Sequence, residues 1–186
     1  LKIQNLGGEE AEDVVAKVTG IDPDEWSLRD EEEDFDDLSP PNPKYGTEGE
    51  IKTHYFELEA PELPEGITQT YRPVVRTYYK YRTTATKPIT VVNENELRRL
   101  IQEGKPIPTG ESKASSGPLT VDVTTGKYIK VKDDPEFPIT IHIENTGGGT
   151  VSEYSSYGSG EDDYEVELEI ELPRGMSLRG DCSGFS

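Results

Sequence analysis

The segment at 137–150, FPITIHIENTGGGT, constrains the fold of this 186-residue chain more than any other. Its isoleucines at alternate positions, Ile139, Ile141 and Ile143, are separated by polar residues. A period of two is the pattern of a β-strand with one buried face. The asparagine and three glycines that follow predict a turn directly after this strand.

The chain begins with a shorter copy of this motif. The pattern Ile-x-Asn-x-Gly-Gly occurs at 3–8 and again at 143–148, and a second pattern, Leu-Pro-x-Gly, occurs at 63–66 and at 172–175. Each Leu-Pro-x-Gly closes a stretch of alternating acidic residues. The first copy has strand candidates after this turn that the second copy lacks, and the second has strands before its Asn-x-Gly-Gly turn that the first lacks. We therefore predict two related modules, each incomplete.

Other strands are predicted from the clustering of β-branched and aromatic residues, which fit a pleated surface. For 11–19 a short helix is the rival interpretation, but the valines cluster and Gly20 ends the run, so we favour a strand. The remaining predicted strands are 51–60, 68–75, 76–84, 119–123, 128–132 and 164–172. Between the first two strands, 22–49 is rich in acids and prolines and predicts an acidic surface loop pinned by Trp26 and Phe35.

One helix is predicted, beginning at Asn93 or Asn95 and ending at Gly104. Leu97, Leu100 and Ile101 form its apolar stripe at helical spacing. A linker rich in proline, glycine and serine follows at 105–118. The predicted fold is all-β: two immunoglobulin-like antiparallel β-sandwich modules at 1–92 and 119–186, joined by the short helix and Pro/Gly-rich linker at 93–118.

The repeated patterns Ile-x-Asn-x-Gly-Gly and Leu-Pro-x-Gly are accompanied by a valine-rich strand and a strand with alternating acidic residues. This combination resembles the CARDB-type and related immunoglobulin-like repeats of archaeal and bacterial cell-surface and S-layer-type proteins. The resemblance covers 1–86 and 119–178. It implies antiparallel sandwiches that serve as spacers, adhesive modules or lattice-building units. It supplies no catalytic residues.

Composition excludes several classes of partner. The net charge of −19 opposes binding to a phosphate backbone, so no nucleic-acid partner is expected. No apolar run of about 18 residues exists, so no membrane insertion of this segment is expected. Cys182 is the only cysteine, which excludes a disulfide framework and a cysteine-rich zinc site. The chain starts with Leu1, and we expect either a removed leader or an excerpt of a longer polypeptide.

Calcium is the one metal that the acidic composition suggests. Ca²⁺ takes six to eight oxygen ligands from carboxylates such as those of the acidic loop, although their spacing does not fit an EF-hand. The alternative to calcium binding is an acidic surface loop that is simply solvated. No cofactor is required. The candidate ligands are Asp22, Asp24, Asp30, Glu32, Asp34 and Asp36.

No residue constellation indicates a reaction, and we do not expect an enzyme. The only histidines, His54 and His142, are predicted to point outward from the middle of strands, with no nucleophile placed beside them. The segment at 180–184, Gly-Asp-Cys-Ser-Gly, has the wrong order for a protease nucleophile loop. Catalytic residues are therefore predicted to be absent.

Incomplete modules suggest how the protein works. An incomplete sheet exposes an edge to which a strand of another copy can add through main-chain hydrogen bonds. We predict a structural protein of an archaeal extracellular filament or surface layer, in which copies of the chain form a homopolymer. The candidate donors are the first five residues and the tail from Met176. The candidate interface residues are Leu1, Ile3, Tyr71, Arg76, Tyr79, Arg82, Met176 and Leu178.

Two alternative functions stay open at this point. One is an adhesive or ligand-binding ectodomain of a larger surface protein, and the other is an archaeal virion structural protein. Both use the same class of sandwich as the structural assembly. All three place the chain outside the cell or at its surface.

Overall fold

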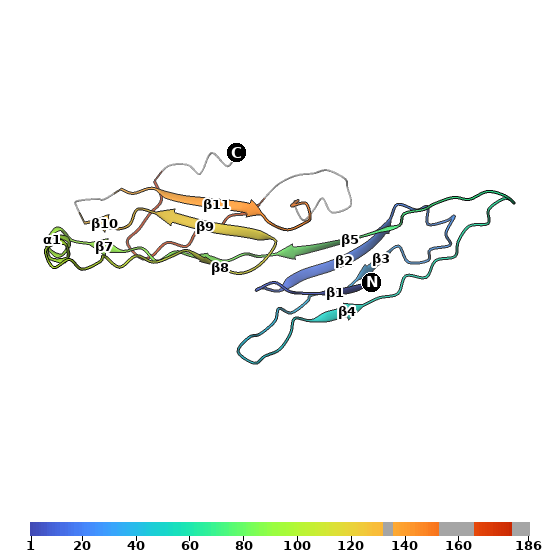
Figure 1. Ribbon diagram of the computed structural model, residues 1–186, viewed down its shortest axis with the longest axis horizontal. Helices are drawn as coiled ribbons and strands as arrows, with labels where there is room; N and C mark the ends of the chain where they lie inside the picture. Colours follow the sequence, from blue (N-terminus) through green and yellow to red (C-terminus); the bar gives the residue numbers. More distant parts are fainter. Residues whose placement is uncertain (132–135, 153–165, 180–186) are drawn as a thin grey trace. The chain divides into compact units, whose positions relative to one another are not determined.

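The computed structural model describes residues 1–131, 136–152 and 166–179. By its internal contacts the chain divides into two units, Leu1–Gly149 and Thr150–Ser186. All helices and strands of the described residues belong to the first unit (Figure 1). The second unit contributes the described stretches 150–152 and 166–179, which contain a turn but no strand.

The first unit consists of short β-ladders and one helix, which confirms the all-β prediction in its coarse form. Five ladders pair β1 with β4, β3 with β2, β2 with β5, β6 with β8 and β9 with β11, all antiparallel, and β7 pairs with β10 in parallel (Figure 1). The elements are β1 Lys2–Gln4, β2 Ala11–Thr19, β3 Glu32–Asp34, β4 Ile51–Thr53, β5 Val74–Tyr81, β6 Ala85–Thr86, β7 Val91–Val92, α1 Glu94–Gln102, β8 Lys113–Ala114, β9 Leu119–Thr125, β10 Ile129–Lys130 and β11 Ile139–Asn145.

Strand β2 is the centre of the main core, and the helical alternative for this segment is wrong. Val14, Ala16 and Val18 are all buried on one face of the strand, as the alternation predicts. Gly20 ends the run with a φ of +82°, and a Cβ there would lie 2.9 Å from the Arg72 carbonyl oxygen. A left-handed backbone in close contact with another segment favours glycine at this position.

The predicted acidic loop is wrong for its central part. Residues 32–34 form β3, which pairs with β2, and Phe35 and Leu38 are buried in the core that β2 forms. The prediction that Phe35 pins this segment is confirmed. The ladder tolerates the acidic strand because its side chains meet lysine across the pair: Lys17 lies opposite Glu32, with their charged groups 3.9 Å apart.

Several predicted strand bounds are also wrong. The ladder of β4 is three residues long, and the chain from 54 to 60 forms no strand. No strand occupies 68–73 either, because Pro73 lacks the N–H that a ladder needs and β5 begins just after it. Of the predicted strand 164–172, residues 164 and 165 lie outside the described residues and 166–172 form no ladder.

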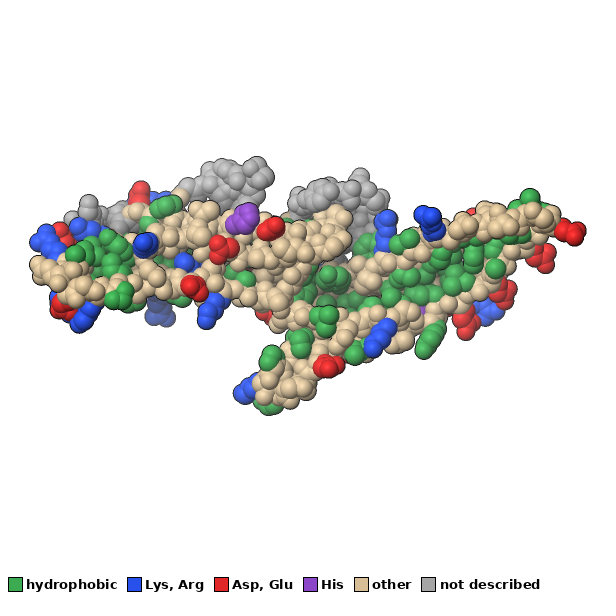
Figure 2. All heavy atoms as spheres, viewed as in Figure 1, with side chains coloured by type: hydrophobic (Ala, Val, Ile, Leu, Met, Phe, Trp, Pro, Cys, Tyr) green, Lys and Arg blue, Asp and Glu red, His purple; other side chains and the backbone are tan. Residues whose placement is uncertain are grey.

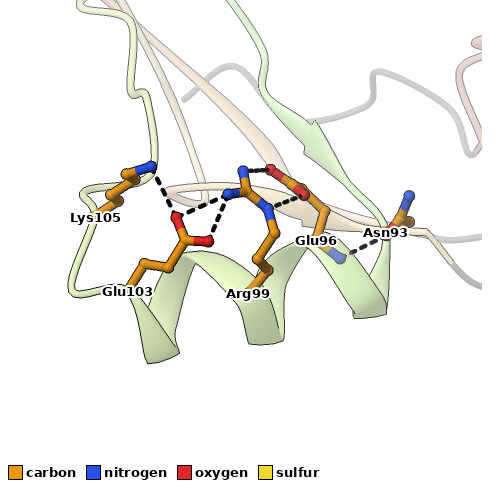
Figure 3. A network of polar contacts seen from close by, with 5 residues as sticks. All are labelled: Asn93, Glu96, Arg99, Glu103 and Lys105. Atoms are coloured by element: carbon orange, nitrogen blue, oxygen red, sulfur yellow. Dashed lines mark hydrogen bonds and ion pairs between the residues drawn. The ribbon is translucent and has the colours of Figure 1, made fainter.

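The helix prediction is confirmed at both ends. The Asn93 side-chain oxygen accepts a hydrogen bond from the Glu96 N–H at 2.8 Å, and Gly104 follows the helix with a φ of +64°. Leu97 is buried, whereas Ile101 is exposed. Figure 3 shows Arg99 between Glu96 and Glu103, with Lys105 on the far side of Glu103. This exposed network raises the pKa of Arg99 through hydrogen bonds from its guanidinium to both carboxylates.

The segment at 105–118 is more ordered than a linker. It contains β8, the Ser115 N–H donates to the Thr84 carbonyl oxygen at 2.9 Å, and Lys87 donates to the Gly110 carbonyl oxygen at 2.8 Å. Strand β7 before the helix pairs with β10 after the linker. The parts of the first unit on the two sides of the helix therefore share ladders, and the predicted boundaries 1–92, 93–118 and 119–186 stay a prediction.

Candidate functional site: a repeated turn and an unpaired strand edge

The two Asn-Gly-Gly motifs form the same turn. In the first, the Asn5 side-chain oxygen accepts from the Gly7 N–H at 2.8 Å and its amide donates to the Glu9 carbonyl oxygen at 2.9 Å. In the second, Asn145 accepts from the Gly147 N–H at 3.1 Å and donates to the Gly149 carbonyl oxygen at 2.9 Å. Each asparagine thus bridges the residues two and four positions ahead. The repeat seen in the sequence is a repeat of structure.

The surroundings of these two turns differ. Asn5 is buried and its amide donates a further bond to the Leu38 carbonyl oxygen at 2.7 Å. Asn145 is exposed, and no such third bond is made to the described residues. Both turns nevertheless bind one segment: the Gly8 N–H donates to the Ser116 carbonyl oxygen, and the Thr146 and Gly147 N–H groups donate to that of Pro118.

The Leu-Pro-x-Gly motifs are also structurally equivalent. The Ile67 N–H donates to the Pro64 carbonyl oxygen, and the Met176 N–H donates to that of Pro173, both at 3.1 Å. The glycine of each turn has a positive φ, +80° at Gly66 and +88° at Gly175. The sequence match extends further than the turn: FELEAPELPEG at 56–66 and VELEIELPRG at 166–175 align with one inserted residue, Pro61, and three substitutions. Apart from this insertion, the repeat extends from the acidic stretch through the turn.

The first copy has a covered apolar face. Phe56, from the first FELE stretch, packs against the buried cluster Ala11, Val14, Ala16, Phe35 and Leu38, as do Ile3 and Tyr81. The ring of His54 lies between those of Phe35 and Phe56, with centroids 6.4 and 4.6 Å away. This half-buried His54 corrects the outward position predicted for it, whereas His142 is exposed as predicted.

The second copy has an apolar face that is not buried. Strands β9 and β11 pair with Ile141 opposite Val123 and Ile143 opposite Val121, so these side chains share one face. All four are only half-buried. A two-stranded ladder is marginally stable unless its apolar face is packed against something. The described residues do not supply a full cover for this face.

Among the described residues, β5 lies at the edge of its three-stranded sheet, where it pairs with β2. Its odd-numbered residues continue the core face of β2, with Val75 opposite Val18 and Thr77 opposite Ala16. On this face Val75 is 41% exposed and Tyr79 is 47% exposed. The core therefore reaches Tyr81 at one end of β5 but leaves Val75 and Tyr79 partly exposed.

The opposite face of β5 is basic. Even-numbered positions place Arg76 and Lys80 on this face, with Arg72 and Arg82 just beyond the two ends of the strand. Lys80 forms an ion pair with Asp13 at 2.6 Å. Within the described part of the chain, none of the three arginines has an ion-pair partner. Figure 2 shows basic side chains beside a run of hydrophobic ones over the part of the first unit that carries β2 and β5.

The predicted interface residues fall in several places. Arg76 and Tyr79 lie on β5, and Arg82 follows it. Tyr71 packs edge-on against Trp26, with ring centroids 4.9 Å apart, and burial with the nearby Glu25 carboxylate raises the pKa of Tyr71. Met176 and Leu178 belong to the second unit, where Leu178 is 52% exposed.

Strand β1 is not a free donor, contrary to the role predicted for the first five residues. Ile3 lies opposite Lys52 in the ladder of β1 with β4 and packs against the core. The Leu1 ammonium donates to the His54 carbonyl oxygen at 2.8 Å. Of the tail predicted as the other donor, residues 180–186 lie outside the described residues.

Three of the six predicted calcium ligands contact the backbone or a lysine. Asp22 accepts from the Asp24 and Glu25 N–H groups, Asp34 accepts from the Asp36 N–H, and Glu32 faces Lys17. In the described ranges, no three His, Cys, Asp or Glu residues gather into a group that can hold a metal ion. Calcium binding by Asp22, Asp24, Asp30, Glu32, Asp34 and Asp36 stays a prediction from composition.

Comparison with known proteins identifies no family: no family model, curated protein or solved structure matches this chain. The function must therefore be inferred from the site itself. No helix among the described residues is long and apolar enough to cross a membrane.

Proposed function

We propose that the chain is a structural protein of an extracellular filament or surface layer, assembled from copies of itself by the addition of β-strands between subunits. In this proposal the two repeats are immunoglobulin-like modules, each completed by contact with another copy. The assembly has no catalytic residues.

The observation that carries the proposal is the position of β5 at the edge of its sheet among the described residues, with Val75 and Tyr79 partly exposed. An edge strand presents unpaired N–H and C=O groups, and soluble proteins usually protect long edges with charges, prolines or a covering segment. Strand β5 has eight residues, and on its core face Val75 and Tyr79 are largely exposed. Its arginines discourage pairing with another basic strand and favour an acidic one.

The open face of β9 and β11 supports the same conclusion. In the first copy, the FELE stretch brings Phe56 onto the apolar cluster around β2. In the second, the aliphatic side chains of the ladder are half-buried and Val166 of the matching stretch is 46% exposed. Contacts between copies that cover such faces gain the free energy of apolar burial.

The test is the state of association of the purified chain as a function of concentration. Multi-angle light scattering and negative-stain electron microscopy should show particles that grow into filaments or sheets. A chain that stays monomeric to about millimolar concentration, where even weak specific contacts form, would contradict the proposal. Calcium at millimolar concentration is a separate arm, because assembly only in its presence would assign a role to the acidic segment.

A further inference from the structure

The loop 39–50, between β3 and β4, forms a hydrogen-bonded hairpin. The Asn42 N–H donates to the Thr47 carbonyl oxygen at 2.9 Å, and the Thr47 N–H donates back to the Asn42 carbonyl oxygen at 3.2 Å. The Asn42 side-chain oxygen also accepts from the Lys44 N–H at 3.1 Å, and Gly46 turns the chain with a φ of +66°. These bonds hold the hairpin in one shape in the free chain, which lowers the entropy cost of binding a partner.

The stem of this hairpin is attached to the first Asn-x-Gly-Gly turn. The Glu50 N–H donates to the Ser39 carbonyl oxygen at 2.9 Å, and the Asn5 N–H donates to the Glu50 carbonyl oxygen at 3.1 Å. A Cβ at Gly49 would clash with the Asn5 carbonyl oxygen, so this close approach requires glycine. Figure 1 shows the loop extending away from the ladder of β1 with β4. The hairpin therefore extends from the buried one of the two repeated turns.

The tip of the hairpin presents two side chains suited to recognition, those of Lys44 and Tyr45. Tyr45 is 72% exposed, and the Lys44 ammonium lies 5.5 Å from the centre of its ring. Lys44 has no ion-pair partner in the ranges that the structure describes. Figure 2 shows hydrophobic and basic side chains at the end of this loop. Tyrosine is one of the residue types that most often dominate the free energy of binding at protein interfaces.

Two adjoining surface cavities of the first unit have a matching character. The polar cavity, of about 410 Å³, is lined by the carboxylates of Glu111 and Asp122 and by several hydroxyl side chains. The apolar cavity, of about 390 Å³, is lined mainly by apolar side chains. These apolar side chains are those of Ile101, Ile107 and Tyr128. Thr109 and Lys127 line both cavities, so the cavities meet at these residues.

The charged groups of the two cavities differ in what they contact. Lys87 of the polar cavity donates to a backbone carbonyl oxygen at 2.8 Å, and Lys105 of the apolar cavity pairs with a neighbouring carboxylate at 2.8 Å. Glu111 and Asp122 have no ion-pair partner among the described residues. These two carboxylates are therefore open to an ammonium group from outside.

We propose that the tip of the hairpin 39–50 in one copy docks into these two cavities of a second copy, with Tyr45 in the apolar cavity and Lys44 in the polar one. This inference rests on the proposed self-assembly and adds a contact between side chains to it. Each copy carries both a tip and a pair of cavities, so the contact is heterologous. Heterologous contacts repeat from copy to copy and can build a filament or a layer.

The tip and the cavities match in chemistry and in arrangement. Lys44 and Tyr45 lie side by side, as the two cavities do. Contact of Tyr45 with Ile107 and Tyr128 removes apolar surface from water. The Lys44 ammonium gains charge-assisted hydrogen bonds to Asp122 and to the hydroxyl groups beside it. The two side chains of the tip therefore find different partners in one docking event.

The first experiment removes the aromatic ring of the tip in the full chain. Tyr45→Ala should raise the concentration at which assembly begins at least about thirtyfold, because a central aromatic contact is lost. Tyr55→Ala is the matched control: it removes a tyrosine that is 82% exposed outside the hairpin, and it should assemble like the unmodified chain. Light scattering measures the onset of assembly, and circular dichroism compares the folding of both variants.

The second experiment exchanges the charges of the tip and the polar cavity. K44E changes only the tip, and E111K with D122K changes only the cavity. Each variant alone places like charges across the contact, so the onset concentration should rise at least about tenfold. An equimolar mixture should assemble within about twofold of the unmodified onset, because alternating copies then pair opposite charges, and this recovery shows that both variants are folded. R29E, an exposed charge reversal outside the hairpin, should have no effect.

The outcomes distinguish the two proposals. Failure of the unmodified chain to associate overturns the proposed self-assembly. Association that Tyr45→Ala and both charge variants leave unchanged overturns only the docking of the tip, as does a mixture that does not recover. If one chain with all three charge substitutions assembles normally but the mixture does not, the tip and the cavities meet within one copy, and this inference is wrong.

Discussion

The same Asn-x-Gly-Gly turn occurs twice in this chain, in two different environments. Both asparagines accept from the N–H two residues ahead and donate to the carbonyl four residues ahead. Only Asn5 is buried and reaches a third partner, the Leu38 carbonyl oxygen, from a segment distant in the sequence. The local sequence therefore forms the turn, whereas long-range packing makes one copy part of a core and leaves the other at the surface.

The largest difference between the copies should appear when each asparagine is removed. Asn5→Ala leaves the buried Leu38 carbonyl and the turn groups without their partner, and should lower the free energy of unfolding by about 2–4 kcal/mol. Asn145→Ala should cost less than about 1 kcal/mol, because water replaces the lost bonds. Urea unfolding of the first unit's strands measures both. An equal decrease in the free energy of unfolding for both variants would mean that the burial of Asn5 does not strengthen its hydrogen bonds.

The covering residues should show the second difference. Phe56→Ala removes a side chain that packs on the core of the first copy, and should cost about 2 kcal/mol of stability. Leu168→Ala, in the matching stretch of the second copy, should change the stability of dispersed chains by less than about 0.5 kcal/mol. Thermal unfolding at a concentration below assembly tests this pair. A large loss for Leu168→Ala would show that 168 is already packed within its own chain.

The two Leu-Pro-x-Gly turns should respond alike, which tests whether the repeat is local. Gly66 and Gly175 both have a positive φ, and a Cβ at either position meets no atom within 4 Å. Alanine at either position should therefore cost about 1 kcal/mol of local stability through backbone strain alone. Hydrogen exchange of the Ile67 and Met176 amides should accelerate about fivefold in the respective variants. Unequal acceleration would show that one turn is supported by more distant contacts.

The smallest effect is expected from acid on the region around α1. Hydrogen bonds from Arg98 and Arg99 lower the pKa of Glu94 and of Glu96, and Lys130 on β10 contributes to the shift at Glu94. A carboxyl whose folded pKa lies below its unfolded value of 4.5 stabilises the fold above that value and loses this contribution as pH falls through the folded pKa. Both groups are fully exposed, so solvent screening keeps the effect small.

Hydrogen exchange below pH 4.5, corrected for the intrinsic rate, should show loss of protection in α1 before β2. The buried face of β2 is apolar and has no carboxylate to protonate. Simultaneous loss in both elements would mean that the region around α1 and the main core unfold as one cooperative unit.

Local signals predicted much of this fold. The alternation at 139–143 predicted β11, Asn93 and Gly104 predicted both ends of α1, and the valines of 11–19 predicted β2. Local sequence patterns gave wrong predictions where the structure depends on which strands pair. The acids and prolines of 22–49 suggested a loop, but Lys17 across the ladder accommodates Glu32 and the core buries Phe35.

The candidate site was predicted less completely. The basic strand with Arg76 and Tyr79 was singled out from its sequence, but its position at the edge of a sheet follows from which strands pair. The role of β1 as a donor was wrong because its partner, β4, lies about fifty residues away in the sequence and no local pattern identifies it. The repeat at 56–66 and 166–175 was only partly recognised because Pro61 interrupts its alignment.

By itself the sequence determined the turns, the helix ends and the period-two strands, because each depends on backbone preferences and hydrogen bonds within a few residues. Only the tertiary structure decided which copy of a motif is buried, which strands pair with each other and which apolar faces are covered. Those outcomes depend on contacts between distant segments, whose free energy is gained only when the chain brings them together.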